Sequence, residues 1–140
     1  PVGQPDPAFD GAWMSLDLAH GLPRLIESQR ESWTPQMLSL ERLHAFSLKK
    51  GCYPGQEIVA RTHYLGQARR GLCRVLGSGL EIGAILRDGQ SNPVGSIICT
   101  TPDAESALAV LQLDRKEATV AIDGQAVALP DFQEGLARPL

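Results

Sequence analysis

Downstream of Gly66, short β-branched runs alternate with clusters of turn-forming residues, and this spacing restricts the fold more than any other feature. The turn clusters are GSG, DGQSNP, TPDAE and DRKEA. They predict strands at about 69–76, 82–87, 93–100, 106–113 and 118–128. Short strands at this spacing, with almost no helical pattern between them, indicate an antiparallel β-barrel or sandwich.

The segment before Gly66 has a different residue pattern, with loop and helix signals in place of strand signals. Its opening PVGQPDPAFDG predicts a loop, AWMSLDLAHG predicts a short helix closed by Gly21, and Pro35 opens a short helix or an irregular connection. We therefore expect an α+β protein that is mainly β. Residues 1–66 would be the end of one domain, and residues 67–140 a complete C-terminal β-barrel domain, both belonging to a longer protein.

Charge and hydropathy narrow the class of protein. The net charge of -3 argues against wrapping nucleic acid by backbone neutralisation, so no direct nucleic-acid binding is expected. No apolar run approaches the roughly 20 residues that a membrane-spanning helix needs, and no leader-like segment opens the chain. We expect a cytoplasmic protein that does not interact with membranes.

The stretch KKGCYPGQEIVAR contains a helix signal. Pro54 suits the first helical position and Gly66 suits a terminator, so a helix is predicted over 54–64, packed against the barrel. Glu57 and Arg61 are four residues apart and are expected to form an ion pair on this helix. Its buried stripe is predicted to consist of Ile58, Val59, Thr62 and Leu65.

The same stretch places a thiol, Cys52, just ahead of that helix and directly after Lys49 and Lys50. A helix N-terminus and two cations favour the thiolate and lower the pKa of a thiol. Gly51 and Gly55 reduce side-chain bulk, so another group could approach the backbone closely. Two roles remain open on these residues alone: a reactive thiol, or a buried cysteine in a tight turn.

The other two cysteines, Cys73 and Cys99, lie in predicted strands. Cysteine in a strand behaves as a small buried hydrophobe, and we expect that role for both. Three widely spaced cysteines, with no C-x-x-C and no histidine pair nearby, predict neither a disulfide framework nor a metal site.

Residues Lys50-Gly51-Cys52-Tyr53-Pro54-Gly55-Gln56-Glu57, followed by Arg61, match the K-G-C-Y-x-G-Q-E-x-x-x-R signature of the YgfZ family. Upstream, Trp13, Gly21-Leu22-Pro23 and Pro35 to Leu38 also resemble that family, so the resemblance covers essentially the whole chain. It implies the fold of the T-protein, the aminomethyltransferase of the glycine cleavage system, with three domains around a folate-binding cavity. It also implies an additional amino-terminal region of roughly 150 residues or more.

For function, the resemblance implies tetrahydrofolate binding and support of iron–sulfur enzymes, among them the radical enzyme that methylthiolates tRNA. The essential cysteine of the family corresponds to Cys52, a candidate redox centre or nucleophile. Its folate-contacting tryptophan corresponds to Trp13, whose indole offers a flat apolar face to a pteridine ring. The cofactor-binding candidates are Trp13, Lys50, Tyr53, Gln56, Glu57 and Arg61. Expected partners are folate and client iron–sulfur enzymes.

Some positions depart from the family pattern. Met14 and Ala19 stand where relatives often carry an arginine and an acidic residue, and an acidic residue in this neighbourhood helps aminomethyltransferases to hold the pterin edge. The main hypothesis is therefore a folate-binding accessory protein, and the alternative is an aminomethyltransferase-like one-carbon transferase. Trp13 also suits a core anchor, and Glu57 with Arg61 suits plain helix stabilisation.

Overall fold

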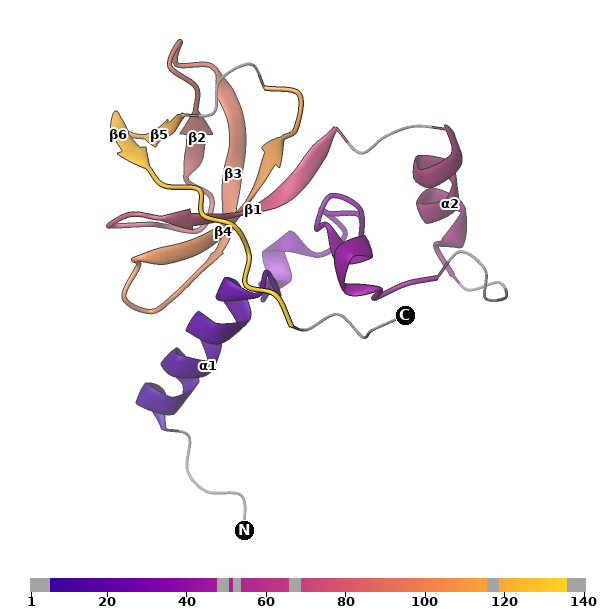
Figure 1. Ribbon diagram of the computed structural model, residues 1–140, viewed down its shortest axis with the longest axis horizontal. Helices are drawn as coiled ribbons and strands as arrows, with labels where there is room; N and C mark the ends of the chain where they lie inside the picture. Colours follow the sequence, from indigo (N-terminus) through magenta and orange to yellow (C-terminus); the bar gives the residue numbers. More distant parts are fainter. Residues whose placement is uncertain (1–5, 48–50, 52–53, 66–68, 116–118, 136–140) are drawn as a thin grey trace.

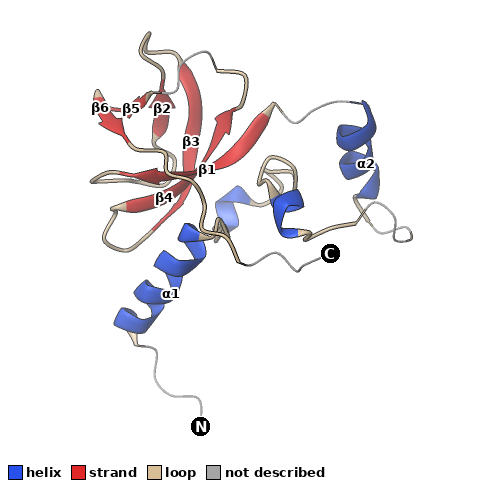
Figure 2. Ribbon diagram, viewed as in Figure 1, coloured by secondary structure: helices blue, strands red, loops and turns tan. Residues whose placement is uncertain are grey.

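The computed structural model describes residues 6–47, 51, 54–65, 69–115 and 119–135, and the chain is mainly β (Figures 1 and 2). Its helices are α1 (Pro7–Ala19), the 3-10 helices η1 (Glu27–Gln29) and η2 (Leu40–Leu43), and α2 (Gln56–Leu65). Its strands are β1 (Arg70–Leu76), β2 (Ile85–Arg87), β3 (Pro93–Thr100), β4 (Ser106–Gln112), β5 (Val120–Ile122) and β6 (Gln125–Val127).

The six strands form one antiparallel sheet in the order β1-β4-β3-β2-β5-β6. The two edges of this sheet meet, because Leu76 at the end of β1 and Ala128 just after β6 exchange backbone hydrogen bonds of 2.9 and 3.0 Å. Joining the edge strands leaves fewer unpaired backbone groups at the sheet margin. The predicted mainly β fold, with an antiparallel barrel-like sheet, is confirmed.

The strand boundaries agree with the turn signals within one residue except at β2, which begins at Ile85 and not at 82 because residues 82–83 form a turn, and toward the end of the chain. The run 118–128 was expected to be one strand, but it is a hairpin of β5 and β6. Asp123 and Gly124 connect the two strands with φ of 48° and 82°. Positive φ at both central residues is the requirement of a type I′ hairpin turn, which Asp-Gly fills well.

Two apolar clusters hold the structure together: one inside the barrel, and one on its outer face beneath α1, which we call the outer core. Strand β4 belongs to both. Ala107, Ala109 and Leu111 face the barrel interior, while Leu108 and Val110 face outward. The outward pair is covered by Leu18 of α1, Leu38 and partly buried neighbours, so β4 is buried on both faces. The near-continuous apolar sequence of β4 reflects this double burial.

Helix α1 begins earlier than the sequence reading placed it. Residues 7–11 were expected to be loop, but Asp6 caps the helix by accepting a hydrogen bond from the Ala8 N–H at 3.0 Å, and Pro7 follows as the first helical residue. An aspartate N-cap followed by proline is a favourable helix start.

None of the described helices has both the length and the apolar character that spanning a bilayer would require.

Helix α2 (Gln56–Leu65) forms close to the predicted range of 54–64, but it does not lie where it was predicted. Figure 1 shows it to one side of the sheet, and the prediction that it packs against the barrel wall is wrong. Its contact is with the segment around η2, where the Gln36 side chain reaches the Val59 carbonyl. Val59 is buried, whereas Ile58 is 60% exposed and does not belong to a buried stripe.

Candidate functional site

Helix α1 carries an exposed aromatic pair. The rings of Phe9 and Trp13 meet edge to face, with 6.1 Å between centroids and 77° between planes. Trp13 is 47% exposed and Leu16, further along the same helix, is 45% exposed. Edge-to-face contact leaves part of an indole face free for another flat group. Trp13 is therefore not a core anchor in this structure.

The C-terminus of α1 is fixed at a junction where three segments meet: the end of α1, Arg42 and Phe132. The N–H of Gly21 donates to the Leu18 carbonyl at 3.0 Å, and the N–H of Leu22 donates to the Asp17 carbonyl at 2.8 Å. With Gly21 at φ +68°, this is a Schellman ending. The glycine-leucine-proline element of the sequence thus has a structural role, because it stops α1 and turns the chain.

Arg42 completes this junction. Its Nη2 donates to the His20 carbonyl at 2.5 Å and to the Gly21 carbonyl at 2.8 Å, and its guanidinium lies 4.2 Å from the centre of the Phe132 ring. A cation at the last carbonyls of a helix complements its dipole. Burial lowers the pKa of Arg42 from its ordinary value, although arginine remains charged in proteins. The junction sets the direction in which α1, and Trp13 with it, leaves the barrel.

The start of α2 differs from the sequence prediction by two residues. Gln56, not Pro54, is the first helical residue. Gly55 has φ +83°, and its carbonyl accepts the N–H groups of Ile58 and Val59 at 3.2 and 3.5 Å. A left-handed glycine at this point explains why Pro54 remains outside the helix. Lys50, Cys52 and Tyr53 lie outside the described residues.

Space is open beside the described glycines of the motif. A Cβ built on Gly51 or on Gly55 would meet none of the described residues within 4 Å, apart from the glycine's own chain neighbours. The prediction that another group could approach the backbone here is compatible with this geometry. Gln56 is half-buried at the first position of α2, and its role in cofactor binding stays a prediction.

Glu57 and Arg61 are both exposed on α2. The ion pairs within the described ranges are Asp17–Arg24 and Glu27–Arg30, so the expected Glu57–Arg61 pair is absent from them. An exposed pair of this kind contributes only a few tenths of a kcal/mol, which is too little to hold two long side chains together.

The predicted site residues fall into two separate groups. Trp13 lies on α1 and the described motif residues lie on α2, and Figure 1 shows these helices at opposite sides of the molecule. They are apart because the C-terminal end of α1 packs on the outer face of β4, whereas α2 contacts the segment around η2. A hollow of about 460 Å³ lies elsewhere, between residues 77–80 and the β5–β6 hairpin, and includes none of the predicted site residues.

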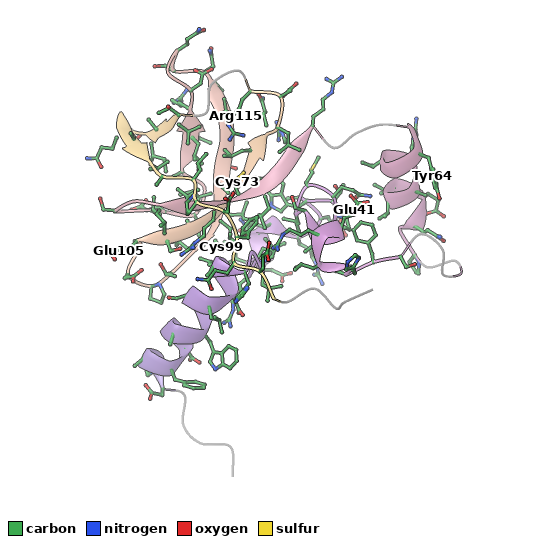
Figure 3. The ribbon with its side chains drawn as sticks, in the orientation of Figure 1. Glu41, Tyr64, Cys73, Cys99, Glu105 and Arg115 are labelled. Carbon is green, nitrogen blue, oxygen red and sulfur yellow. The ribbon has the colours of Figure 1, made fainter. Side chains whose placement is uncertain are left out.

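The two described cysteines are strand residues, as predicted. Figure 3 shows Cys73 and Cys99 within the sheet, well away from Tyr64 on α2. Burial raises the pKa of both thiols, and at Cys73 the nearby Arg115 cation opposes that rise in part. Both are free thiols. The described residues contain no group of three histidine, cysteine or acidic side chains able to hold a metal ion.

Sequence reasoning missed Gln36. This side chain is 6% exposed, and its Nε2 donates to the Val59 carbonyl of α2 at 2.8 Å. The available signal was a single amide residue within the Pro35 to Leu38 element, between apolar neighbours. A buried amide normally has a specific hydrogen-bond partner, but the sequence does not reveal which one.

Comparison with known proteins gives a consistent set of relatives. No protein-family model matches the chain. The "tRNA-modifying protein YgfZ" of Edwardsiella ictaluri is 44% identical over 71 residues, which are 51% of this chain and 22% of that protein. The proteins of the same name from Hamiltonella defensa and Yersinia enterocolitica are 39% and 36% identical over 79 and 76 residues, or 50% and 54% of this chain. These alignments cover 24% and 23% of the two relatives, so the chain spans only about a quarter of the length of the relatives named here.

Proposed function

Because this chain belongs to the YgfZ family, we propose that it binds tetrahydrofolate and supports the assembly or repair of iron–sulfur enzymes, tRNA-modifying enzymes among them. The name of the relatives, "tRNA-modifying protein", supports the part that concerns tRNA-modifying enzymes. The observation that carries the folate part is the half-exposed indole of Trp13, held next to Phe9 on a helix whose end is fixed.

The residues of α1 fit one part of a folate molecule better than the other. Trp13 presents an apolar face on which a pteridine or aminobenzoyl ring could stack. Met14 packs toward the outer core and Ala19 is 6% exposed, so neither offers a hydrogen bond to the pterin edge. Since aromatic stacking contributes only about 0.5–1.5 kcal/mol beyond buried area, the 140-residue chain should bind tetrahydrofolate weakly. We expect a dissociation constant of about 0.1 mM or weaker, equivalent to roughly 5.5 kcal/mol.

Tryptophan fluorescence during titration with tetrahydrofolate tests this proposal. The chain has two tryptophans, so Trp33→Phe reports on Trp13 alone, and Trp13→Phe corrects for light absorbed by the folate. Saturable quenching should persist in Trp33→Phe and disappear in Trp13→Phe. Equal quenching in both variants would show that the folate site is not at Trp13, and tight binding would contradict the expected weak contact.

For Cys52, we propose redox, sulfur or iron chemistry that serves the client enzymes. Its sequence setting between Lys50 and the start of α2, and the open space beside Gly51 and Gly55, support this role. Cells whose own gene carries Cys52→Ser should lose methylthiolated tRNA nucleosides, measured by mass spectrometry. Cells carrying Cys73→Ser, the matched control, should keep them. Normal nucleoside levels in the Cys52→Ser cells would make that cysteine structural.

A further inference from the structure

Gln36 links α2 to the rest of the chain. Its Nε2 donates to the Val59 carbonyl at 2.8 Å, and both residues are almost fully buried, at 6% and 5% exposure. Val59 lies in the first turn of α2, three residues after Gln56. The bond therefore acts on the end of the helix into which the signature motif leads.

The turn that carries Gln36 is itself tied to the barrel. The Ser39 N–H donates to the Gln36 carbonyl at 2.9 Å, and the Ser39 Oγ accepts a hydrogen bond from the Leu72 N–H of β1, also at 2.9 Å. Leu38, between them, is buried in the outer core. A continuous path of hydrogen bonds thus runs from β1 through Ser39 and Gln36 to α2.

The amide of Gln36 is poorly explained by stability alone. Its Oε1 is buried and has no hydrogen-bond partner among the residues that the structure describes. A buried acceptor without a partner costs at least as much free energy as one hydrogen bond of the same amide returns. Methionine has a similar length and shape and no such acceptor, so it would fill the site at least as favourably. What methionine cannot supply is a directional bond to α2.

We propose that Gln36 is a positioning residue for the signature motif: its amide fixes α2, and with it the turn at Pro54 and Gly55, relative to the barrel. This inference rests on the proposed role of Cys52, because it assigns to Gln36 the placement of that residue's surroundings. The apolar contact of Val59 is non-directional and would let the helix rotate or slide. The hydrogen bond defines one rotation and one height along the helix axis.

Gln36→Met tests this assignment, with Gln29→Met as the matched control. Gln29 also donates its Nε2 to a backbone carbonyl, that of Ile98 in β3, at 2.9 Å, and its Oε1 accepts the Ile26 N–H at 3.1 Å, so its described hydrogen bonds lead to β3 and not to α2. Two measurements are made on each variant: hydrogen exchange of the α2 amides, and the pH profile of Cys52 alkylation. Gln36→Met should speed exchange in α2 about fivefold, the factor that loss of one hydrogen bond gives, and should shift the alkylation profile. Gln29→Met should change neither.

Each outcome has a distinct meaning. Unchanged exchange in the α2 amides of Gln36→Met would overturn the proposal, and so would faster exchange with an unaltered alkylation profile. If both measurements change but cells carrying Cys52→Ser keep their iron–sulfur enzyme activity, positioning by Gln36 stands and the proposed function of Cys52 fails.

Discussion

Replacing Gly21 by alanine should destabilise the chain far more than the same replacement at another left-handed glycine. Gly21 has φ +68°, and an added Cβ would lie 2.1 Å from Arg42 Nη2 and 2.7 Å from Phe132 Cε1. Gly79 has nearly the same φ, +65°, but a Cβ there would meet no described residue within 4 Å beyond its chain neighbours. Comparing Gly21→Ala with Gly79→Ala therefore separates the free energy of backbone strain from the free energy lost when the junction at the end of α1 is broken.

The two contributions can be estimated separately. A left-handed alanine costs about 1–2 kcal/mol, and this applies to both variants. At Gly21 the guanidinium of Arg42 must also move, which breaks its bonds to the His20 and Gly21 carbonyls. Bonds from a charged donor contribute about 1.5–3 kcal/mol each, and partial exposure of Arg42 reduces this. We expect a total of about 3–5 kcal/mol for Gly21→Ala and about 1–2 kcal/mol for Gly79→Ala.

Urea denaturation of the two variants, followed by circular dichroism, measures the difference in the free energy of unfolding. A second readout is the emission of Trp13 in a Trp33→Phe background, since the direction of α1 depends on this junction. Gly21→Ala should alter that emission, and Gly79→Ala should not. Equal destabilisation of the two variants, within about 0.5 kcal/mol, would refute the energetic role assigned to Arg42.

Three further predictions concern the barrel and the three cysteines of the chain. Gly95→Ala should cost about 3 kcal/mol in urea denaturation, because its Cβ would lie 2.2 Å from the Val110 carbonyl oxygen and push β3 and β4 apart; a loss below about 1 kcal/mol would contradict this. Burial raises the pKa of the Cys99 thiol in the folded state. The stability that this thiol contributes is therefore fully present below the pKa of the unfolded state, about 8.5, and is lost as the pH rises through the higher pKa of the folded state. Cys99→Ala should flatten this alkaline fall in the free energy of unfolding. Mass mapping after alkylation at neutral pH should find Cys52 labelled before Cys73 and Cys99. Labelling of Cys52 after the other two would show that its thiol is not activated.

The strands could be read from the sequence because each is bounded by a local turn signal. Residues 93–100 form β3 with the predicted bounds, since DGQSNP and TPDAE mark both ends. The same kind of signal, Asp123-Gly124, was present inside the run 118–128, and it outweighs the β-branched character of its neighbours. Asp6-Pro7 was likewise a helix start within a segment whose overall composition suggested loop.

The candidate site was less predictable because its geometry depends on contacts between distant residues. Helical spacing gave α2 an apolar face that includes Ile58 and Val59, but only the partner decides which of them is buried. The Val59 carbonyl is bound by Gln36, which lies 23 positions earlier in the chain, and no local pattern indicates that contact. The placement of α2 away from the barrel wall has the same origin.

The later start of α2 alters the expected cause of thiol reactivity at Cys52. With Gly55 as the N-cap and Gln56 as the first helical residue, Cys52 precedes the cap by three positions, and the helix dipole weakens within about a turn. The charges of Lys49 and Lys50 then become a second reason for a stabilised thiolate, beside the part of the helix dipole that still reaches Cys52. Such charges are screened by salt, since the Debye length falls from about 30 Å at 0.01 M to about 3 Å at 1 M. Alkylation of Cys52 by iodoacetamide, an uncharged reagent, should therefore slow about threefold between these salt concentrations at pH 7. Lys50→Gln should slow the reaction at low salt and weaken its dependence on salt. If the rate responds neither to salt nor to this substitution, the lysines do not stabilise the thiolate and the helix terminus is the cause.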